Sequence, residues 1–172
     1  MDFTLRPFGK ADADSVAKYA NNAKIAAKLR NVFPHPYSKA DARAFIESCV
    51  KEEGERQMIR AICIGGEAVG SIGIFPKEDV HEQSAELGYW LGEPFWNQGI
   101  ITKAIGEICA QAFARYDIVR IYAEPFAENA GSRRVLEKAG FSLEGVMKKS
   151  VLKNGKLQDS CLYAFIKEES HA

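Results

Sequence analysis

Several features that mark specialised protein classes are missing from this sequence. Its 172 residues include only four cysteines and three histidines, and 23 basic residues balance 23 acidic ones. A balanced charge argues against bulk electrostatic binding of nucleic acid. No apolar run approaches the ~20 residues of a membrane-spanning helix. The N-terminus lacks the basic and apolar regions of a signal peptide. We therefore expect neither a membrane nor a nucleic-acid partner.

The cysteines also carry no recognisable motif. Cys49, Cys63, Cys109 and Cys161 are dispersed and form no C-x-x-C pair. Dispersed cysteines at apolar positions indicate reduced core residues rather than a metal site. This pattern predicts a cytoplasmic protein without a bound metal.

Common catalytic and nucleotide-binding motifs are absent as well. There is no Walker lysine, no G-x-G-x-x-G and no G-x-S-x-G. None of the histidines, which are His35, His81 and His171, lies in a nucleophile motif, so a Ser-His-Asp hydrolase is not expected.

What remains is an ordinary globular composition, with 47% hydrophobic and 27% charged residues. The length suits one domain over residues 1–172. Apolar periodicity and turn residues predict the elements in order. They are a strand at 3–8, a helix at 10–29 that breaks near Asn21 and Asn22, a helix at 38–53, strands at 58–64 and 68–75, a strand at 87–91, a helix from 102, a strand at 118–123, a helix from Asn129 or Ser132 to 139, and strands at 141–152 and 157–166.

The stretch from Glu86 to Ala112 organises the rest of the chain. It begins as a short aromatic strand, continues through Gly92, Pro94, Asn97 and Gly99, and then changes to a helical period. A strand, glycine loop and helix in this order present free backbone N–H groups and the positive end of a helix dipole. The stretch therefore predicts a site for a phosphate.

A second block, Asn129-Ala-Gly-Ser132 followed by Arg-Arg-Val-Leu-Glu-Lys-Ala-Gly140-Phe141, lies downstream of an apolar strand. The two blocks, Glu-Leu-Gly-Tyr-Trp-Leu with its glycine loop and this one, together resemble the motifs of the GNAT acyltransferases, in particular their RimJ/RimL-like branch. The resemblance implies an α/β (α+β) fold, the GNAT fold. Its centre is a mixed, mostly antiparallel twisted sheet of about seven strands with a parallel strand–helix–strand crossover, flanked by helices.

The same resemblance implies acetyl-CoA as co-substrate. From the residues themselves, backbone N–H groups of 98–103 can hold a pyrophosphate, and Gly99 allows close approach. The sequence departs from the pattern of the broader superfamily at three positions. Trp96 stands where that pattern has Gln or Arg, although Trp is usual for the RimJ/RimL-like branch. Ile101 is bulkier than the expected Gly or Ala, and Lys103 replaces a frequent Glu. The expected cofactor-binding residues are Leu91, Trp96, Gln98, Gly99, Ile100, Ile101, Thr102, Lys103, Asn129 and Ser132.

Two residues are predicted to carry the chemistry. Glu86 is the first candidate for the base, and strand alternation places it on the face opposite Leu87 and Tyr89; Glu82 and Glu144 are weaker candidates. Ser132 occupies the slot where many family members place a tyrosine beside the sulfur. The alternatives are that Glu86 is a strand-end surface charge and that Ser132 and Asn129 only cap a helix.

We predict direct acetyl transfer to a primary amine, with His35, Glu82 and Tyr89 contacting the acceptor. A protein N-terminal α-amine is preferred by resemblance alone. Other possibilities stay open: a small amine, polyamine or amino compound as acceptor, a non-catalytic acyl-CoA sensor, or a nucleotide-binding or interaction domain. The edge strand of the C-terminal hairpin is a candidate homodimer contact.

Overall fold

The structure is a computed structural model that describes residues 1–169, so His171 lies outside the described residues. Its strands are β1 (Thr4–Arg6), β2 (Met58–Ile64), β3 (Glu67–Pro76), β4 (Ser84–Leu91), β5 (Arg120–Ala123), β6 (Ser142–Lys153) and β7 (Lys156–Ile166). They form one seven-stranded sheet in the order β1-β2-β3-β4-β5-β7-β6. The β4–β5 pair is parallel and the other neighbours are antiparallel. The predicted mixed sheet with one crossover is confirmed.

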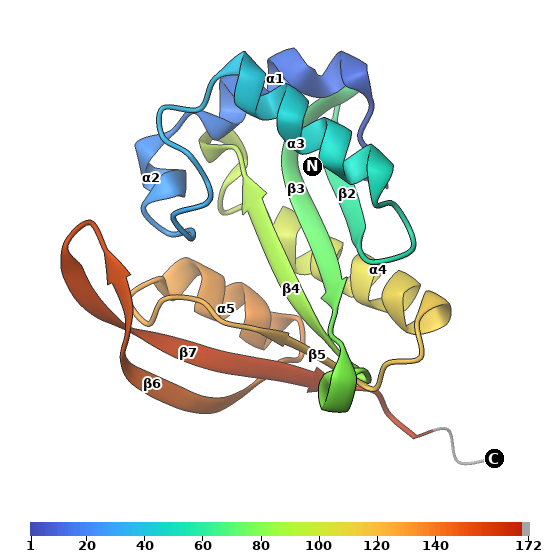
Figure 1. The fold of residues 1–172 in the computed structure, drawn as a ribbon, viewed down its shortest axis with the longest axis vertical. Coiled ribbons are helices and arrows are strands. Elements are labelled where there is room, and N and C mark those ends of the chain that lie inside the picture. Colours follow the sequence, from blue (N-terminus) through green and yellow to red (C-terminus); the bar gives the residue numbers. More distant parts are fainter. Residues whose placement is uncertain (170–172) are drawn as a thin grey trace.

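Helices cover both faces of the sheet (Figure 1). They are α1 (Ala13–Ala20), α2 (Ala23–Ala26), α3 (Lys39–Lys51), α4 (Ile100–Arg115) and α5 (Ala130–Lys138), with 3-10 turns η1 (Lys10–Asp12), η2 (Asp79–His81) and η3 (Glu93–Phe95). One buried cluster contains Ile105 and Ile108 of α4. A second contains Val16 of α1, Ile46 of α3 and Trp90 of β4. The central strand β4 therefore packs between two separate cores.

The predicted boundaries follow local chemistry. The helix break comes at Asn22, whose side chain accepts hydrogen bonds from the first turn of α2. Ser38 and Asp41 form a capping box at the start of α3. Asn129, rather than Ser132, caps α5. Asn154 and Gly155 take φ of 51° and 74° and close the β6–β7 hairpin.

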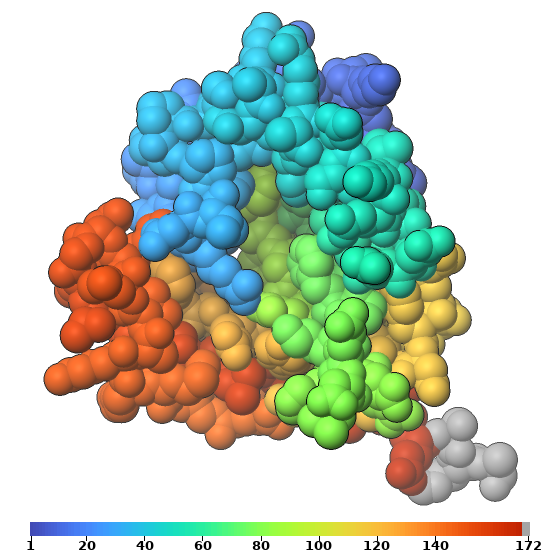
Figure 2. Space-filling model, viewed as in Figure 1, coloured from blue at the N-terminus to red at the C-terminus, as the bar shows by residue number. Residues whose placement is uncertain are grey.

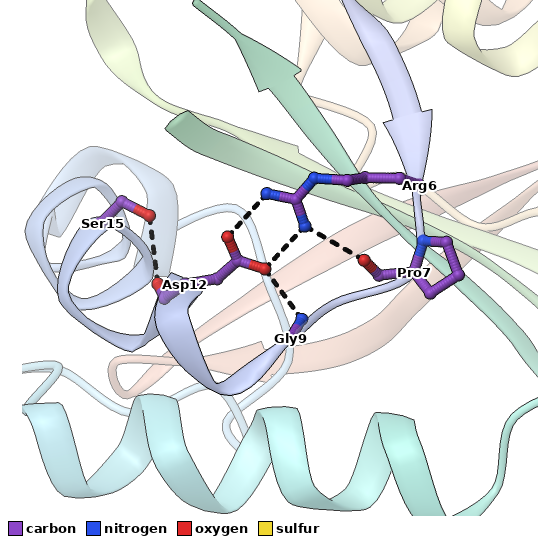
Figure 3. Close-up of polar contacts among 5 residues, drawn as sticks. All are labelled: Arg6, Pro7, Gly9, Asp12 and Ser15. Atoms are coloured by element: carbon purple, nitrogen blue, oxygen red, sulfur yellow. Dashed lines mark hydrogen bonds and ion pairs between the residues drawn. The ribbon is translucent and has the colours of Figure 1, made fainter. Parts of the chain in front are cut away.

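An ion pair between the partly exposed Arg6 and the buried Asp12 ties the first strand to the first helices (Figure 3). The Asp12 carboxylate accepts two hydrogen bonds from the Arg6 guanidinium, at 2.8 and 2.7 Å, and one from the Gly9 N–H at 2.8 Å. The Ser15 hydroxyl donates to the Asp12 carbonyl at 3.0 Å. The Arg6 guanidinium holds the pKa of the Asp12 carboxyl below its ordinary value. This cluster fixes where α1 starts relative to β1.

Replacing Asp12 with Asn removes the negative charge from this cluster. We expect the free energy of unfolding at pH 7 to fall by about 2 kcal/mol, because Arg6 loses its charged partner. A lowered pKa in the folded state stabilises the fold above the unfolded value of about 3.9, and that gain is lost as pH falls through the folded pKa. The free energies of unfolding of wild type and D12N, measured with urea, should therefore become equal at acidic pH. The exposed pair of Asp14 with Lys39 provides the control, since D14N should change little. Equal destabilisation at every pH would contradict the electrostatic account.

Within residues 1–169, no helix is both long and apolar enough to cross a membrane. All four cysteines are buried and unbridged, as predicted for core residues. No group of three or more potential metal ligands gathers in the described part of the chain.

Candidate active site

The two parallel strands separate soon after they meet. Register pairs join β4 and β5 only at Ser84↔Arg120, Ala85↔Ile121 and Glu86↔Tyr122. Strand β4 then continues to Leu91 while paired with β3. Within the described residues, the backbone of 87–91 has no strand partner on its β5 side. Because backbone polar groups need partners, this edge is suited to an extended ligand that continues the sheet.

The loop after β4 presents its backbone to open space. Gly99 caps α4 with φ of +75°, and a Cβ built at this residue would meet nothing within 4 Å. The first-turn N–H groups of a helix lack intrahelical partners, so they and the helix dipole favour an anion here. The geometry fits the predicted phosphate site.

Two predicted cofactor residues use their side chains to shape this loop. The Trp96 indole N–H donates to the Leu91 carbonyl at 2.7 Å, and the Lys28 ammonium lies 4.8 Å from the Trp96 ring centroid. The Gln98 amide donates to the Pro94 carbonyl at 3.1 Å. Trp96 and Gln98 can therefore contribute to a phosphate site by holding the loop in shape or through their backbone N–H groups.

The other predicted positions of the loop differ in exposure. Ile100 is buried in the core, and Ile101 is half-buried and packs against the same core. The bulk of Ile101 is therefore accommodated by core packing. Thr102 is half-buried and Lys103 is exposed, so both are accessible from the start of α4.

Tyr89 and Ser132 meet across the opening. Their hydroxyl oxygens are 2.5 Å apart, and the Asn129 side chain accepts a hydrogen bond from the Ser132 N–H at 3.2 Å. Burial raises the pKa of Tyr89 to about 12, although the hydrogen bond to Ser132 acts in the opposite direction. Tyr89 is therefore protonated at neutral pH. Tyr89 was predicted to contact the acceptor and Ser132 the sulfur, and the structure brings the two side chains together.

Glu86 lies on the opposite face of β4 and is held in an ion pair. Its carboxylate accepts a hydrogen bond from the Arg30 guanidinium, which comes from the segment after α2. The Glu86 side chain is 17% exposed and that of Arg30 is 67% exposed. Glu86 is thus a largely buried carboxylate paired with one long, exposed cationic side chain, rather than a free surface charge. Arg30 belonged to no sequence motif, and nothing in the sequence indicated it.

The remaining predicted residues are dispersed. Glu82 follows η2 and is exposed, and His35 is exposed in the loop before α3. Glu144 accepts two hydrogen bonds from Arg120, at 3.0 and 2.6 Å. None of the polar contacts within residues 1–169 joins these side chains to Glu86. The structure therefore does not gather them into one group.

A hollow lies on the face that carries α2 and α3, with residues coloured as β4 at its bottom (Figure 2). A cavity of about 380 Å³ is lined by residues 27–28 after α2, by residues 126–129, and by the tip of the β6–β7 hairpin at 153–158. Asn129 is among these residues. The cavity wall therefore includes the residue that caps the helix carrying Ser132.

Comparison with known proteins agrees with this geometry. The acetyltransferase (GNAT) domain family matches residues 2–142. Among curated relatives, the uncharacterized N-acetyltransferase YoaA of Bacillus subtilis is 32% identical over 59% of this chain and 56% of its own length. The ribosomal-protein-serine acetyltransferase of Escherichia coli is 32% identical over 58% of this chain and 55% of its own length. These alignments span about half of each relative.

Among solved structures, the microcin C7 self-immunity acetyltransferase MccE, in complex with acetyl-CoA and AMP, superposes with a TM-score of 0.83. It is 25% identical, over 96% of this chain and 92% of that one. With the family match over most of the chain and the opening between β4 and β5, the chain belongs to the GNAT acetyltransferase domain family.

Proposed function

We propose that this protein is an acetyl-CoA-dependent N-acetyltransferase that transfers the acetyl group directly to a primary amine. The observation that carries the proposal is the opening between β4 and β5, with an anion site at the start of α4. Hydroxyl groups of Tyr89 and Ser132 lie on one face of β4, and the Glu86 carboxylate lies on the other. A thioester held along 87–91 would have proton donors and a proton acceptor on its two sides.

The residues have complementary tasks in such a transfer. Acetyl-CoA supplies the activated acetyl group and a thiolate leaving group. Glu86 accepts the proton that the attacking ammonium must lose, directly or through a water molecule. Ser132 donates a hydrogen bond to the sulfur as the C–S bond breaks and the C–N bond forms. The reaction needs no covalent enzyme intermediate, since no cysteine lies within residues 86–102 or 129–141.

For the acceptor, we propose a protein N-terminal α-amine, with a small amine as the second candidate. The similarity to a ribosomal-protein-serine acetyltransferase supports the first choice. An α-amine titrates near pH ~8, so a single carboxylate is an adequate base for it. The four unbridged thiols fit the cytoplasm. Edge strand β6 exposes Leu143 and Val146, which makes it our candidate for a homodimer contact.

The test is free-thiol release from acetyl-CoA in the presence of peptides, polyamines and amino acids. A melting-temperature shift with CoA is measured on the same sample as a binding control. Release that depends on one acceptor class would support the enzyme and identify its substrate type. Stabilisation by CoA without release for any acceptor would favour a sensor. No stabilisation by CoA would overturn the proposal.

Gly99→Ala tests the anion site. The positive φ should make the alanine variant less stable by about 1 kcal/mol. Its methyl group would also project into the open space in front of α4, so we expect the Kd for acetyl-CoA to rise about tenfold. Calorimetric titration measures this change.

Gly106→Ala is the matched control for this variant. It lies in the interior of α4, and a Cβ there would also meet nothing within 4 Å. Alanine should stabilise the helix by roughly 0.5–1 kcal/mol and leave the Kd unchanged. Equal affinities for both variants would place the pyrophosphate away from Gly99.

A further inference from the structure

One buried cation in the molecule has no negative partner. Lys153 ends strand β6 and is only 6% exposed. Its ammonium donates to the Asn31 side-chain oxygen at 3.2 Å, and within residues 1–169 it makes no ion pair with a carboxylate. Burial of a charge without a counter-charge is unfavourable, because a neutral amide replaces only part of the lost hydration. Such a group is suited to an anion that arrives from outside.

Lys153 also lines the 380 Å³ cavity. The other charged residues of its wall are Lys28, Lys156 and Glu128. Glu128 is paired with Lys156 at 3.4 Å, and both side chains are largely exposed. The charges of Lys153 and Lys28 are therefore not balanced within the wall. The cavity is positively charged near its buried lysine.

Two consecutive residues connect this lysine to the proposed base. Arg30 contacts Glu86 on β4, and the next residue, Asn31, contacts Lys153 at the end of β6. Residues 30–31 thus contact a carboxylate on β4 and an ammonium at the end of β6. A ligand that replaced the side-chain contacts of Arg30 and Asn31 would meet the Glu86 carboxylate at one end and the Lys153 ammonium at the other.

We propose that Lys153 forms an anion subsite for the acceptor, so that the substrate is a primary amine that also carries a carboxylate or phosphate group. The inference rests on the proposed transferase function. The acceptor amine takes the place of the Arg30 guanidinium at Glu86, and its anionic group binds the Lys153 ammonium. The phosphates of CoA have their own site in the loop at Gly99, where backbone N–H groups face open space.

The test compares acceptors in matched pairs that differ only in the anionic group. The pairs are glycine with glycinamide, a C-terminally amidated Ser-Asp peptide with the amidated Ser-Asn peptide, and phosphoethanolamine with ethanolamine. They separate a small carboxylate, a peptide carboxylate and a phosphate. We expect kcat/KM of the wild type to favour the anionic member of at least one pair by about tenfold or more.

Lys153→Met should abolish this preference while the rate with the neutral member stays the same. Lys148→Met is the control, because Lys148 lies on the same strand, has a side chain that is 78% exposed and is paired with Asp159. This control should keep the preference. The melting temperature of the free K153M protein should not fall, since the variant removes an unpaired buried charge. A large fall would make Lys153 a structural clamp for Asn31 and overturn the proposal, as would an unchanged preference in K153M.

Binding of inorganic phosphate under saturating CoA separates the remaining cases. Phosphate binding that persists with CoA and disappears in K153M supports the acceptor subsite, even if no amine in the panel is acetylated and the proposed transferase function fails. Competition between phosphate and CoA, with weaker CoA binding in K153M, would assign Lys153 to the CoA phosphates and overturn it. Acetyl transfer with no anion preference in any pair would also overturn it, while the transferase function would stand.

Discussion

Glu86→Gln lowers kcat by about two to three orders of magnitude, with little change in the affinity for acetyl-CoA. The amide keeps the shape of the side chain but cannot accept the ammonium proton. Glu86 lies on the face of β4 opposite the Tyr89–Ser132 contact, so the thioester contacts should survive. Steady-state kinetics with the best acceptor and a CoA titration measure the two quantities separately.

The control for this variant is Glu67→Gln. Glu67 also lies on a strand of the sheet and bonds a lysine and a tyrosine, Lys18 at 3.4 Å and Tyr19 at 2.9 Å, but its strand β3 borders β4 on the edge away from β5. Its kcat should match the wild type. If E86Q turned over like the wild type across the pH range, Glu86 would have no part in proton transfer.

Ser132→Ala lowers kcat about a hundredfold, and Tyr89→Phe lowers it about tenfold. Either hydroxyl group can donate in the Tyr89–Ser132 hydrogen bond. When the protonated Tyr89 donates to the Ser132 oxygen, the Ser132 proton is left for a hydrogen bond to the sulfur. Because the two hydroxyl groups act as one chain, the double variant should be hardly slower than S132A alone. The KM for acetyl-CoA should change little in each.

Tyr116→Phe is the control for loss of a tyrosine hydroxyl. The Tyr116 hydroxyl is buried and has no hydrogen-bond partner in the described part of the chain, and the residue lies at the far end of α4. Its removal should leave kcat unchanged. If the losses of kcat in Y89F and S132A multiplied in the double variant, the two hydroxyl groups would not act as one hydrogen-bonded chain. Tyr89 would then make a separate contact.

Much of the fold was predictable because its signals are local. The predicted helix break near Asn22, the helix start at 38 and the gaps between the strands of both hairpins each depend on a few residues. The structure has helix caps at Asn22 and Ser38 and turns at Gly65-Gly66 and Asn154-Gly155. The crossover followed from the change of period between β4 and α4. The glycine loop could be predicted because the left-handed conformation at Gly99 is set locally, by the glycine itself.

The side-chain contacts of the site were not predictable in the same way. Tyr89 meets Ser132 across 43 residues, Arg30 meets Glu86 across 56, and Lys153 meets Asn31 across 122. Such pairs depend on how distant elements pack against one another, and neither hydrophobic periodicity nor turn residues predict that packing. A single lysine at a hairpin tip is normally solvated, so its burial in particular has no sequence signature.

The central claim, acetyl transfer to an amine in this opening, is tested most directly by mass spectrometry with isotope-labelled acetyl-CoA. The account predicts that the labelled acetyl group appears on the nitrogen of an acceptor amine, in step with thiol release, and that both fall together in E86Q and S132A. Label that stays on CoA for every amine tested, in a protein that CoA stabilises, would contradict it.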